Sequence, residues 1–291
     1  MQHLRDAVQR GGDRERLVTD EVIASFDGTP DPRTREVLES LVEHLHAFAR
    51  DVRLTEREWT KAIEFLTRVG HITDERRQEF ILLSDVLGLS MLTVAINSTD
   101  DEAATESTVF GPFFVEGSPE IAIGGDIAEG VSGEPCWVEG RVTDTHGAPL
   151  AQARIEVWEA DDEGFYDVQQ GETLSGRAHL FTDDDGRYGF WSVKPAPYPI
   201  PYDGPVGDLL KAAQRSPYRP AHIHFMVSHE GHETLVTHVF VAGSEHLDDD
   251  AVFGVKESLI AAASQQAPGE GPAGRTLDAP WWRMTFDLRL A

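Results

Sequence analysis

Residues 136–161, "CWVEGRVTDTHGAPLAQARIEVWEAD", contain two runs in which apolar and polar side chains alternate, separated by "HGAP". Alternation with a period of two is typical of a strand with one buried face, and Gly and Pro between two such runs indicate a turn. The pattern recurs at residues 181–193, "FTDDDGRYGFWSV", and at residues 222–243, "HIHFMVSHEGHETLVTHVFVAG". Short strands joined by turns, without helical segments between them, predict an antiparallel β-sandwich.

The first third of the chain has helical periodicity instead. Residues 31–52 begin with Asp31, a residue type that caps helix N-termini, and continue with Pro32, which fits the first helical turn. Thr55 and Glu58 have the spacing of a capping box at the start of a second helix. These signals predict an α-helical N-terminal region ahead of the sandwich.

Residues 73–98, "TDERRQEFILLSDVLGLSMLTVAINS", predict a third helix with an apolar middle, interrupted by Asp85. A carboxylate in such a setting either faces solvent or meets a partner, because the burial of an isolated charge is costly. The change of pattern after about residue 100 predicts two domains, a helical one at residues 1–105 and the β-sandwich at residues 106–291.

Composition excludes several classes of partner. The net charge is −26, with 51 acidic against 25 basic residues, which disfavours binding to nucleic acid or to an anionic membrane surface. Cys136 is the single cysteine, so no intrachain disulfide can form, as expected in a reducing compartment. No apolar leader opens the chain and no run approaches 18 apolar residues. We therefore expect a soluble cytoplasmic protein without a membrane span.

A pair of histidines suggests a metal site. His222 and His224 lie two residues apart in "RSPYRPAHIHF", which has the pattern of a strand. Side chains at i and i+2 point to the same face, about 7 Å apart along the strand, so the two imidazoles can converge on one metal ion. A solvent-facing polar alternation would produce the same pattern, and the stretch alone leaves both interpretations open.

Two tyrosines occupy unusual settings. Tyr166 follows a predicted strand, and Tyr198 lies in the proline-rich segment 194–207, "KPAPYPIPYDGPVG". Prolines stiffen such a loop, which can then hold one side chain in place at low entropic cost. The alternative is that Tyr198 only packs against the prolines.

The chain resembles the intradiol ring-cleaving dioxygenases, the catechol 1,2-dioxygenase family. The matching segments follow the family's order and spacing over nearly all of residues 30–260. They are "ESTVFGPFF", "GRVTDTHGAPLAQARIEVWEADDEGFYDVQ", "FTDDDGRYGFWSVKPAPYPIPYDGPVGDLL" and "RPAHIHF".

The resemblance implies a mononuclear Fe(III) site, with one ion per chain held by two tyrosinates and two histidines. Carried over position by position, the ligands are Tyr166, Tyr198, His222 and His224. The resemblance also implies that the substrate displaces Tyr198, which then accepts a proton. Arg219 would lie over the substrate and stabilise negative charge on the ring, although a structural salt bridge is an alternative role for it.

Within this family the chain is most similar to the branch that acts on hydroxyquinol, benzene-1,2,4-triol. His238 lies where catechol enzymes commonly have glutamine. The resemblance implies a substrate pocket lined by Leu82, Asp85, Val109, Phe110, Gly111, Pro112, Phe113, Ile200, Pro201 and Val252, together with His238. Asp85 could accept a hydrogen bond from the third ring hydroxyl, and such a site discriminates against a diol that lacks it. The alternative is that Asp85 is exposed at a helix kink.

We therefore expect an intradiol dioxygenase that uses O₂ to open hydroxyquinol to 3-hydroxy-cis,cis-muconate, which tautomerises to maleylacetate. Cleavage of catechol or chlorocatechol is the near alternative, and a metal-free β-sandwich binding module is an alternative of another class. The resemblance also implies a homodimer formed through the N-terminal helices, with a phospholipid as a possible ligand at the interface.

Overall fold

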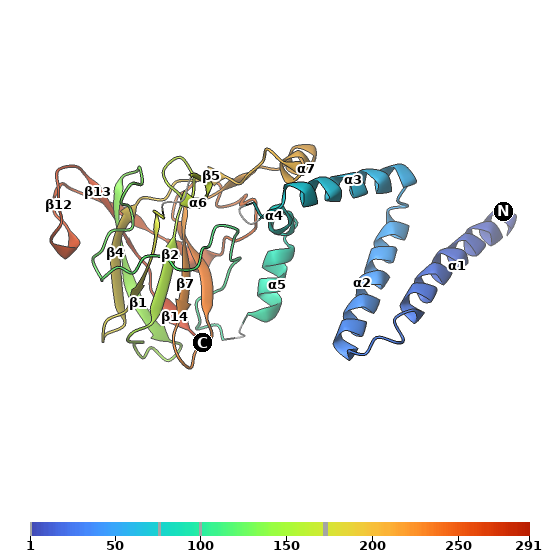
Figure 1. Cartoon of the computed structure of the whole chain (residues 1–291), viewed down its shortest axis with the longest axis horizontal. Coiled ribbons are helices and arrows are strands. Elements are labelled where there is room, and N and C mark those ends of the chain that lie inside the picture. Colours follow the sequence, from blue (N-terminus) through green and yellow to red (C-terminus); the bar gives the residue numbers. More distant parts are fainter. Residues whose placement is uncertain (1, 75–76, 99–100, 171–173) are drawn as a thin grey trace. The chain divides into compact units, whose positions relative to one another are not determined.

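The computed structural model describes residues 2–74, 77–98, 101–170 and 174–291. The chain divides into two compact units, residues 1–67 and residues 68–291. Figure 1 labels their helices and strands along the chain. The predicted domain boundary between residues 105 and 106 stays a prediction.

The first unit is helical. It contains α1 (Gln2–Ala24), α2 (Pro32–Asp51) and the beginning of α3 (Glu56–Ile72). The Asp31 carboxylate accepts a hydrogen bond from the Thr34 amide at 2.8 Å and caps α2, as predicted. At the start of α3 the Thr55 amide donates to the Glu58 carboxylate at 2.9 Å, and the Glu58 amide donates to the Thr55 hydroxyl at 3.3 Å. The predicted capping box is therefore confirmed.

The prediction of one helix at residues 73–98 is wrong. The described part of this span forms two helices, α4 (Glu79–Val86) and α5 (Leu89–Asn97), which differ in direction by 76°, and residues 75–76 lie outside the description. Gly88 lies between the helices with φ of 74°, a left-handed conformation that only glycine adopts readily, and its amide donates to the Asp85 carbonyl at 2.9 Å. Among the described residues no single helix is long and apolar enough to cross a membrane; α4 and α5 reach that length and composition only as a bent pair.

The second unit contains two packed sheets. In Figure 1, β1 and β4 lie in one layer, and β2 and β7 lie in the next. The first sheet comprises β1 (Pro135–Asp144), β4 (Arg187–Val193), β10 (Ala263–Gln266), β13 (Trp281–Thr285) and β14 (Leu288–Leu290). The second sheet has the order β3 (Arg177–Phe181), β2 (Arg154–Trp158), β7 (His222–Ser228), β8 (Leu235–Val241) and β9 (Ile260–Ala261).

The sandwich is confirmed, but its sheets are mixed rather than purely antiparallel. The β1 strand pairs in parallel with both β13 and β14, and β8 pairs in parallel with β9. The hairpins that the sequence signals, such as β7 with β8, are antiparallel. The parallel pairs join strands that are distant in sequence, which local turn signals do not indicate.

Short elements lie in the connections. Two of them are helices, α6 (Asp167–Gln170) and α7 (Pro205–Ala213). The expectation that no helix lies between the strands is therefore wrong. The other connecting elements are β5 (Tyr198–Pro199) paired with β6 (Tyr218–Arg219), β11 (Gly269–Glu270) paired with β12 (Thr276–Leu277), and the 3₁₀ helices η1 (Glu257–Leu259) and η2 (Pro272–Gly274).

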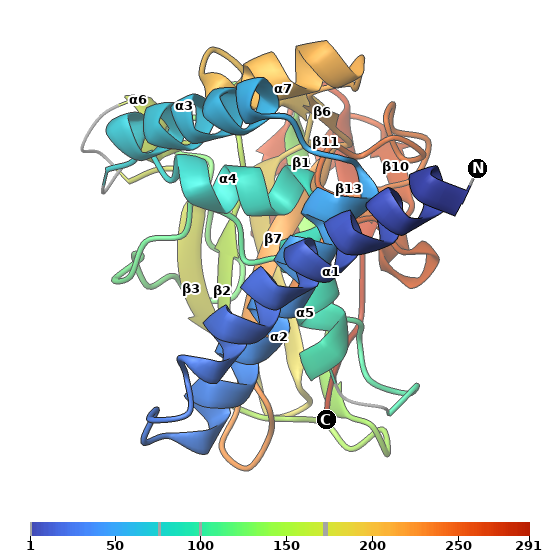
Figure 2. The same ribbon diagram turned by 90° about the vertical axis from the view of Figure 1, so that its right-hand side faces the viewer.

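The strand β7 divides its side chains between two environments. Ile223, Phe225 and Val227 belong to the apolar core between the sheets. Because neighbouring side chains on a strand point to opposite faces, His222 and His224 project from the other face. Figures 1 and 2 agree that α4 and α5 lie on that side of the sheet, away from β1. The core alternation of β7 therefore places both histidines in a space between the sheet and the helices.

Candidate metal centre and active site

Four side chains converge beside β7. Tyr166 comes from the connection after β2 and Tyr198 from β5, and both are at most 3% exposed. The Tyr166 and Tyr198 hydroxyl oxygens are 3.0 Å apart, and the Tyr198 oxygen is 3.3 Å from His222 Nε2. His222 Nε2 is 3.3 Å from His224 Nε2, which is 2.9 Å from the Tyr166 oxygen. The four predicted ligand atoms thus form one closed ring of short contacts.

This ring has the dimensions of a metal site. Four ligand atoms placed tetrahedrally at about 2.0–2.1 Å from a metal ion lie about 3.3–3.4 Å from one another. The observed separations of 2.9–3.3 Å are close to that value. Phenolate oxygens and imidazole nitrogens are ligands for iron and other borderline or hard cations. The residues present therefore fit a metal ion.

The protonation of the two histidines also suits ligation. Burial, and secondly the charge on Arg219, lower the pKa of His222 to about 3. Burial also lowers the pKa of His224 well below its usual range. His222 Nδ1 lies 2.7 Å from the Pro220 carbonyl, which can only accept, so the proton is on Nδ1 and the Nε2 lone pair faces Tyr198. A neutral imidazole with its lone pair turned inward is the form that binds metals.

The pKa values of the two tyrosines are raised, whereas those of the two histidines are lowered. Burial raises the pKa of Tyr166 well above its usual range, with the neighbouring Tyr198 adding to the shift. Burial also raises the pKa of Tyr198, while the charge on Arg219 opposes the shift. Both phenols are therefore protonated without a cation, and a metal ion must displace their protons to bind.

His238 is a third histidine at the same place. It lies on β8 directly opposite His224, and one ring nitrogen from each of His222, His224 and His238 lies within 4.8 Å of the other two. His238 Nδ1 is 2.5 Å from the Thr108 hydroxyl, and His238 Nε2 is 3.5 Å from Arg219 Nη1. A metal ion could use His238, so the histidine cluster by itself does not define the ligand set.

Arg219 is a buried, fixed positive charge. Its Nε donates to the Asp250 carboxylate at 3.0 Å, and its Nη1 lies 3.1 Å from His222 Nε2. Burial lowers the pKa of Arg219, but Asp250 together with Tyr198 and Tyr166 outweighs that effect and raises the pKa above its usual value. The salt bridge considered for Arg219 is thus present, and it holds the guanidinium at the metal site. Asp250 could not be predicted from the sequence, because it is one of three consecutive aspartates with no distinguishing periodicity.

A small cavity of about 20 Å³ adjoins these side chains. Its lining contains Leu82, Asp85, Val109, Gly111, Pro112, Phe113, Tyr198, Ile200, Pro201, Arg219, His224 and Val252. Two of the predicted pocket residues are not in this lining. Phe110 is 40% exposed and packs its ring against Phe114 and Trp158, and His238 lies behind the rings of His222 and His224.

Asp85 faces this cavity and not the solvent. It lies in α4 and is 3% exposed, which excludes the exposed position considered for it. Burial raises the pKa of its carboxyl group, and a hydrogen bond from Ser90 and the charge on Arg219 partly oppose that shift. A buried polar group at an otherwise apolar wall is available to a polar atom of a ligand.

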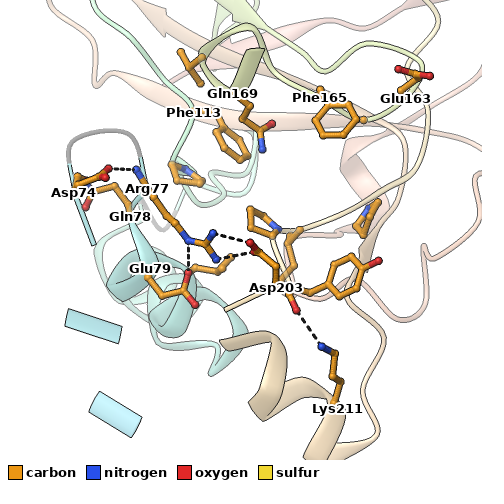
Figure 3. A pocket seen from close by; sticks show the side chains of 18 residues that line it. Asp74, Arg77, Gln78, Glu79, Phe113, Glu163, Phe165, Gln169, Asp203 and Lys211 are labelled. Carbon is orange, nitrogen blue, oxygen red and sulfur yellow. Dashed lines mark hydrogen bonds and ion pairs between the residues drawn. The ribbon is translucent and has the colours of Figure 1, made fainter. Parts of the chain in front are cut away.

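A larger cavity of about 870 Å³ lies outside the small one (Figure 3). The two share Leu82, Pro112, Phe113, Ile200 and Pro201 in their walls, so the larger cavity is the approach to the smaller. Figure 3 shows Arg77 across its edge, bonded to Glu79 and to Asp203. No sequence pattern connects these residues, because Arg77 and Asp203 lie 126 residues apart.

Comparison with known proteins agrees with this geometry. The family model described as "Dioxygenase" matches residues 110–291, and the one described as "Catechol dioxygenase N terminus" matches residues 31–105. This chain belongs to the catechol dioxygenase family. Its members are intradiol dioxygenases that depend on non-haem iron, and the histidine cluster of this chain could bind such a metal.

Three relatives illustrate the degree of similarity within the catechol dioxygenase family. The chain is 60% identical to a hydroxyquinol 1,2-dioxygenase of Nocardioides simplex, with 96% of both chains covered. It is also 60% identical to a hydroxyquinol 1,2-dioxygenase of Rhodococcus opacus, with 95% of this chain and 94% of the relative covered. The crystal structure of hydroxyquinol 1,2-dioxygenase from Pseudomonas putida DLL-E4 superposes with a TM-score of 0.88 at 42% identity, covering 96% of this chain and 99% of that one.

Proposed function

We propose that this chain is a hydroxyquinol 1,2-dioxygenase. It opens benzene-1,2,4-triol with O₂ between the two adjacent hydroxylated carbons and yields 3-hydroxy-cis,cis-muconate, a tautomer of maleylacetate. One observation carries the choice of a triol over a diol. Asp85 is 3% exposed and lies in the wall of the small cavity that also contains Tyr198 and His224.

Tyr166, Tyr198, His222 and His224 hold one Fe(III) per chain in this proposal. Their donor atoms form the closed ring of 2.9–3.3 Å contacts, and two phenolates favour the ferric state because they are hard anionic donors. An iron ion held by these four residues would supply the chemistry that makes an aromatic diol reactive toward O₂.

Tyr198 and Arg219 are the proposed catalytic residues. Both lie in the wall of the small cavity, so both reach a bound ring. The phenolate of Tyr198 takes the proton of a substrate hydroxyl, since the raised pKa of Tyr198 favours the protonated form once the side chain is not a metal ligand. Arg219 keeps its charge and stabilises negative charge that develops on the ring.

The cavity wall supplies the selection of substrate. Most of the wall is apolar, and we propose that it holds the ring by shape; Leu82, Val109, Gly111, Pro112, Phe113, Ile200, Pro201 and Val252 form this part. Asp85 accepts a hydrogen bond from the third hydroxyl. Catechol or chlorocatechol would leave the Asp85 carboxyl without that partner, which disfavours them as preferred substrates. The metal-free binding module has no support among the relatives, which are dioxygenases.

The helical unit is proposed to form a homodimer. No residue of α2 is buried, and its apolar side chains Val37, Leu41, Leu45 and Phe48 are between 46% and 57% exposed. An uncovered apolar stripe on a helix of this length is typical of an interaction surface. The same stripe would accept the acyl chains of a phospholipid at the interface.

Side-by-side kinetics test the proposed function. Steady-state rates on hydroxyquinol, catechol and 4-chlorocatechol would be measured with the iron-loaded enzyme, with O₂ uptake recorded and the products identified. We expect the highest kcat/KM on hydroxyquinol, one O₂ consumed per ring and no need for NADH. A higher kcat/KM on catechol would contradict the choice of substrate. A semialdehyde product, formed by cleavage beside the diol, would contradict the intradiol reaction itself.

A further inference from the structure

We infer that Thr108 and His238 are positioning residues that hold the guanidinium of Arg219 beside the metal ligands, and that His238 is neither a metal ligand nor a substrate contact. This inference rests on the proposed function. It concerns a chain of contacts from Thr108 through His238 to Arg219, which continues to Asp250. All four side chains are buried, with exposures between 0% and 6%.

Thr108 is a rigid anchor for this chain. Its amide donates to the Val236 carbonyl at 2.9 Å, which fixes the segment alongside β8. Two residues earlier, the Glu106 carbonyl accepts from the Thr237 hydroxyl at 2.7 Å. The backbone at Thr108 is therefore held alongside β8, and from this position its hydroxyl lies 2.5 Å from His238 Nδ1.

The direction of the hydrogen bonds follows from Arg219. A guanidinium only donates, so the atom that faces it must be an acceptor. His238 Nε2 lies 3.5 Å from Arg219 Nη1 and must carry the lone pair, which places the proton of the neutral ring on Nδ1. His238 Nδ1 then donates to the Thr108 hydroxyl. The other tautomer would point an N–H group at a positive charge.

Metal binding makes the contact between His238 and Arg219 more important for holding the guanidinium. Two histidine nitrogens lie near Arg219 Nη1, His222 Nε2 at 3.1 Å and His238 Nε2 at 3.5 Å, and the Tyr198 hydroxyl oxygen accepts a further hydrogen bond from Arg219. A metal ion on His222 uses the lone pair of Nε2, so His222 can no longer accept from Arg219. Of these two histidines, His238 alone remains as an acceptor for Nη1, while Asp250 holds the opposite edge through Nε and Nη2.

A pair of substitutions at Thr108 tests the inference. Thr108→Val keeps the shape of the side chain and removes the hydroxyl, and Thr108→Ser keeps the hydroxyl. We expect Thr108→Val to lower kcat about tenfold, because one buried hydrogen bond no longer fixes the imidazole. KM for hydroxyquinol and the iron content should change little, and Thr108→Ser should restore most of kcat. A lower melting temperature and iron content with unchanged kcat per iron would mean a merely structural role and would overturn the inference.

Substitutions at His238 provide the second arm. His238→Gln keeps an acceptor for Arg219, and His238→Leu does not. We expect both variants to bind one iron per chain with the visible absorption band of the parent, and His238→Leu to lose at least as much kcat as Thr108→Val. Loss of iron or a shifted band in both variants would make His238 a ligand, and a raised KM with unchanged kcat would make it a substrate contact. Either result sinks the inference, whereas a parent enzyme inactive on hydroxyquinol would sink the proposed function separately.

Discussion

At the scale of single residues, two buried carboxylates have different surroundings and different tasks. Asp250 faces Arg219, which lowers the pKa of its carboxyl group although burial alone would raise it. Asp85 has a raised pKa because burial outweighs the opposing contacts. A group in the first setting is satisfied within the protein, whereas a group in the second gains most from a ligand.

Replacement of Asp85 should therefore change specificity. A hydrogen bond to a charged group contributes roughly 1.5–3 kcal/mol, or about ten- to hundredfold. Asp85→Ala should lower kcat/KM for hydroxyquinol by about that factor and reduce catechol turnover much less, or raise it. Equal losses on both substrates would assign Asp85 to the fold. Parallel kinetics on the two substrates, with circular dichroism to check folding, make this measurement.

Replacement of Tyr198 should affect both colour and rate. Tyr198→Phe removes a phenolate ligand and a proton acceptor, so the visible charge-transfer band should shift and most of kcat should be lost while some iron is retained. Tyr188→Phe is a matched control, because Tyr188 is also buried but donates to the Phe286 carbonyl at 2.6 Å, away from the proposed ligands. An unchanged spectrum and rate in Tyr198→Phe would assign Tyr198 to packing.

At the scale of elements, the short helix α6 positions Tyr166. Asp167 begins α6 directly after Tyr166 and forms a buried ion pair with Arg177 of β3, with side-chain exposures of 1% and 2%. The Tyr166 amide also donates to the Gln169 side chain at 2.9 Å. The segment that contains Tyr166 is thus bonded to the edge strand β3 and to α6.

Breaking the ion pair between Asp167 and Arg177 should lower the stability of the fold. Arg177→Gln leaves the Asp167 carboxylate buried without its counter-charge and should lower the free energy of unfolding by about 3–5 kcal/mol. Arg187→Gln is the control, because Arg187 and Asp185 are 67% and 64% exposed and 4.0 Å apart, and such pairs contribute about 0–1 kcal/mol. Urea denaturation of the two variants compares them. Similar small losses would show that the Asp167 carboxylate does not depend on Arg177.

At the scale of the whole molecule, one buried carboxyl group couples stability to pH. Glu159 is 2% exposed, and burial raises its pKa from 4.5 to about 8. Its Oε1 accepts from the Ser192 hydroxyl, and Oε2 has no hydrogen-bond partner among the described residues. The folded protein therefore keeps a proton on Glu159 at pH values where the unfolded chain has lost it.

The sign of the effect follows from this difference in bound protons. Between pH 4.5 and about 8 the native state binds one proton more, so the contribution of Glu159 to stability is complete below pH 4.5 and declines as the pH rises to about 8. The decline is at most about 1.4 kcal/mol per pH unit. Glu159→Gln should flatten this slope, whatever its effect on absolute stability. Denaturant titrations at pH 5.5, 6.5 and 7.5 measure it, and identical slopes in both proteins would contradict the prediction.

The sequence by itself determined the local features of this protein. The period-two alternation identified β7 and placed His222 and His224 on one face, and the cap at Asp31 and the capping box at Thr55 located two helix starts. These signals depend on residues within a few positions of one another, where backbone geometry alone fixes which side chains meet. The resemblance added the two tyrosines, whose distant positions no periodicity connects.

The tertiary structure decided which distant groups meet. Contacts between distant segments include the parallel pairing of β1 with β13, the ion pair of Arg219 with Asp250, and the contact of Thr108 with His238. Their partners lie 31 to 146 residues apart. No local pattern encodes such contacts, because they depend on how the two sheets and their connections pack as a whole. Asp85 shows the same limit. Its sequence neighbours are compatible with a side chain that faces solvent or one that lines a pocket, and only the tertiary structure placed it in the cavity wall.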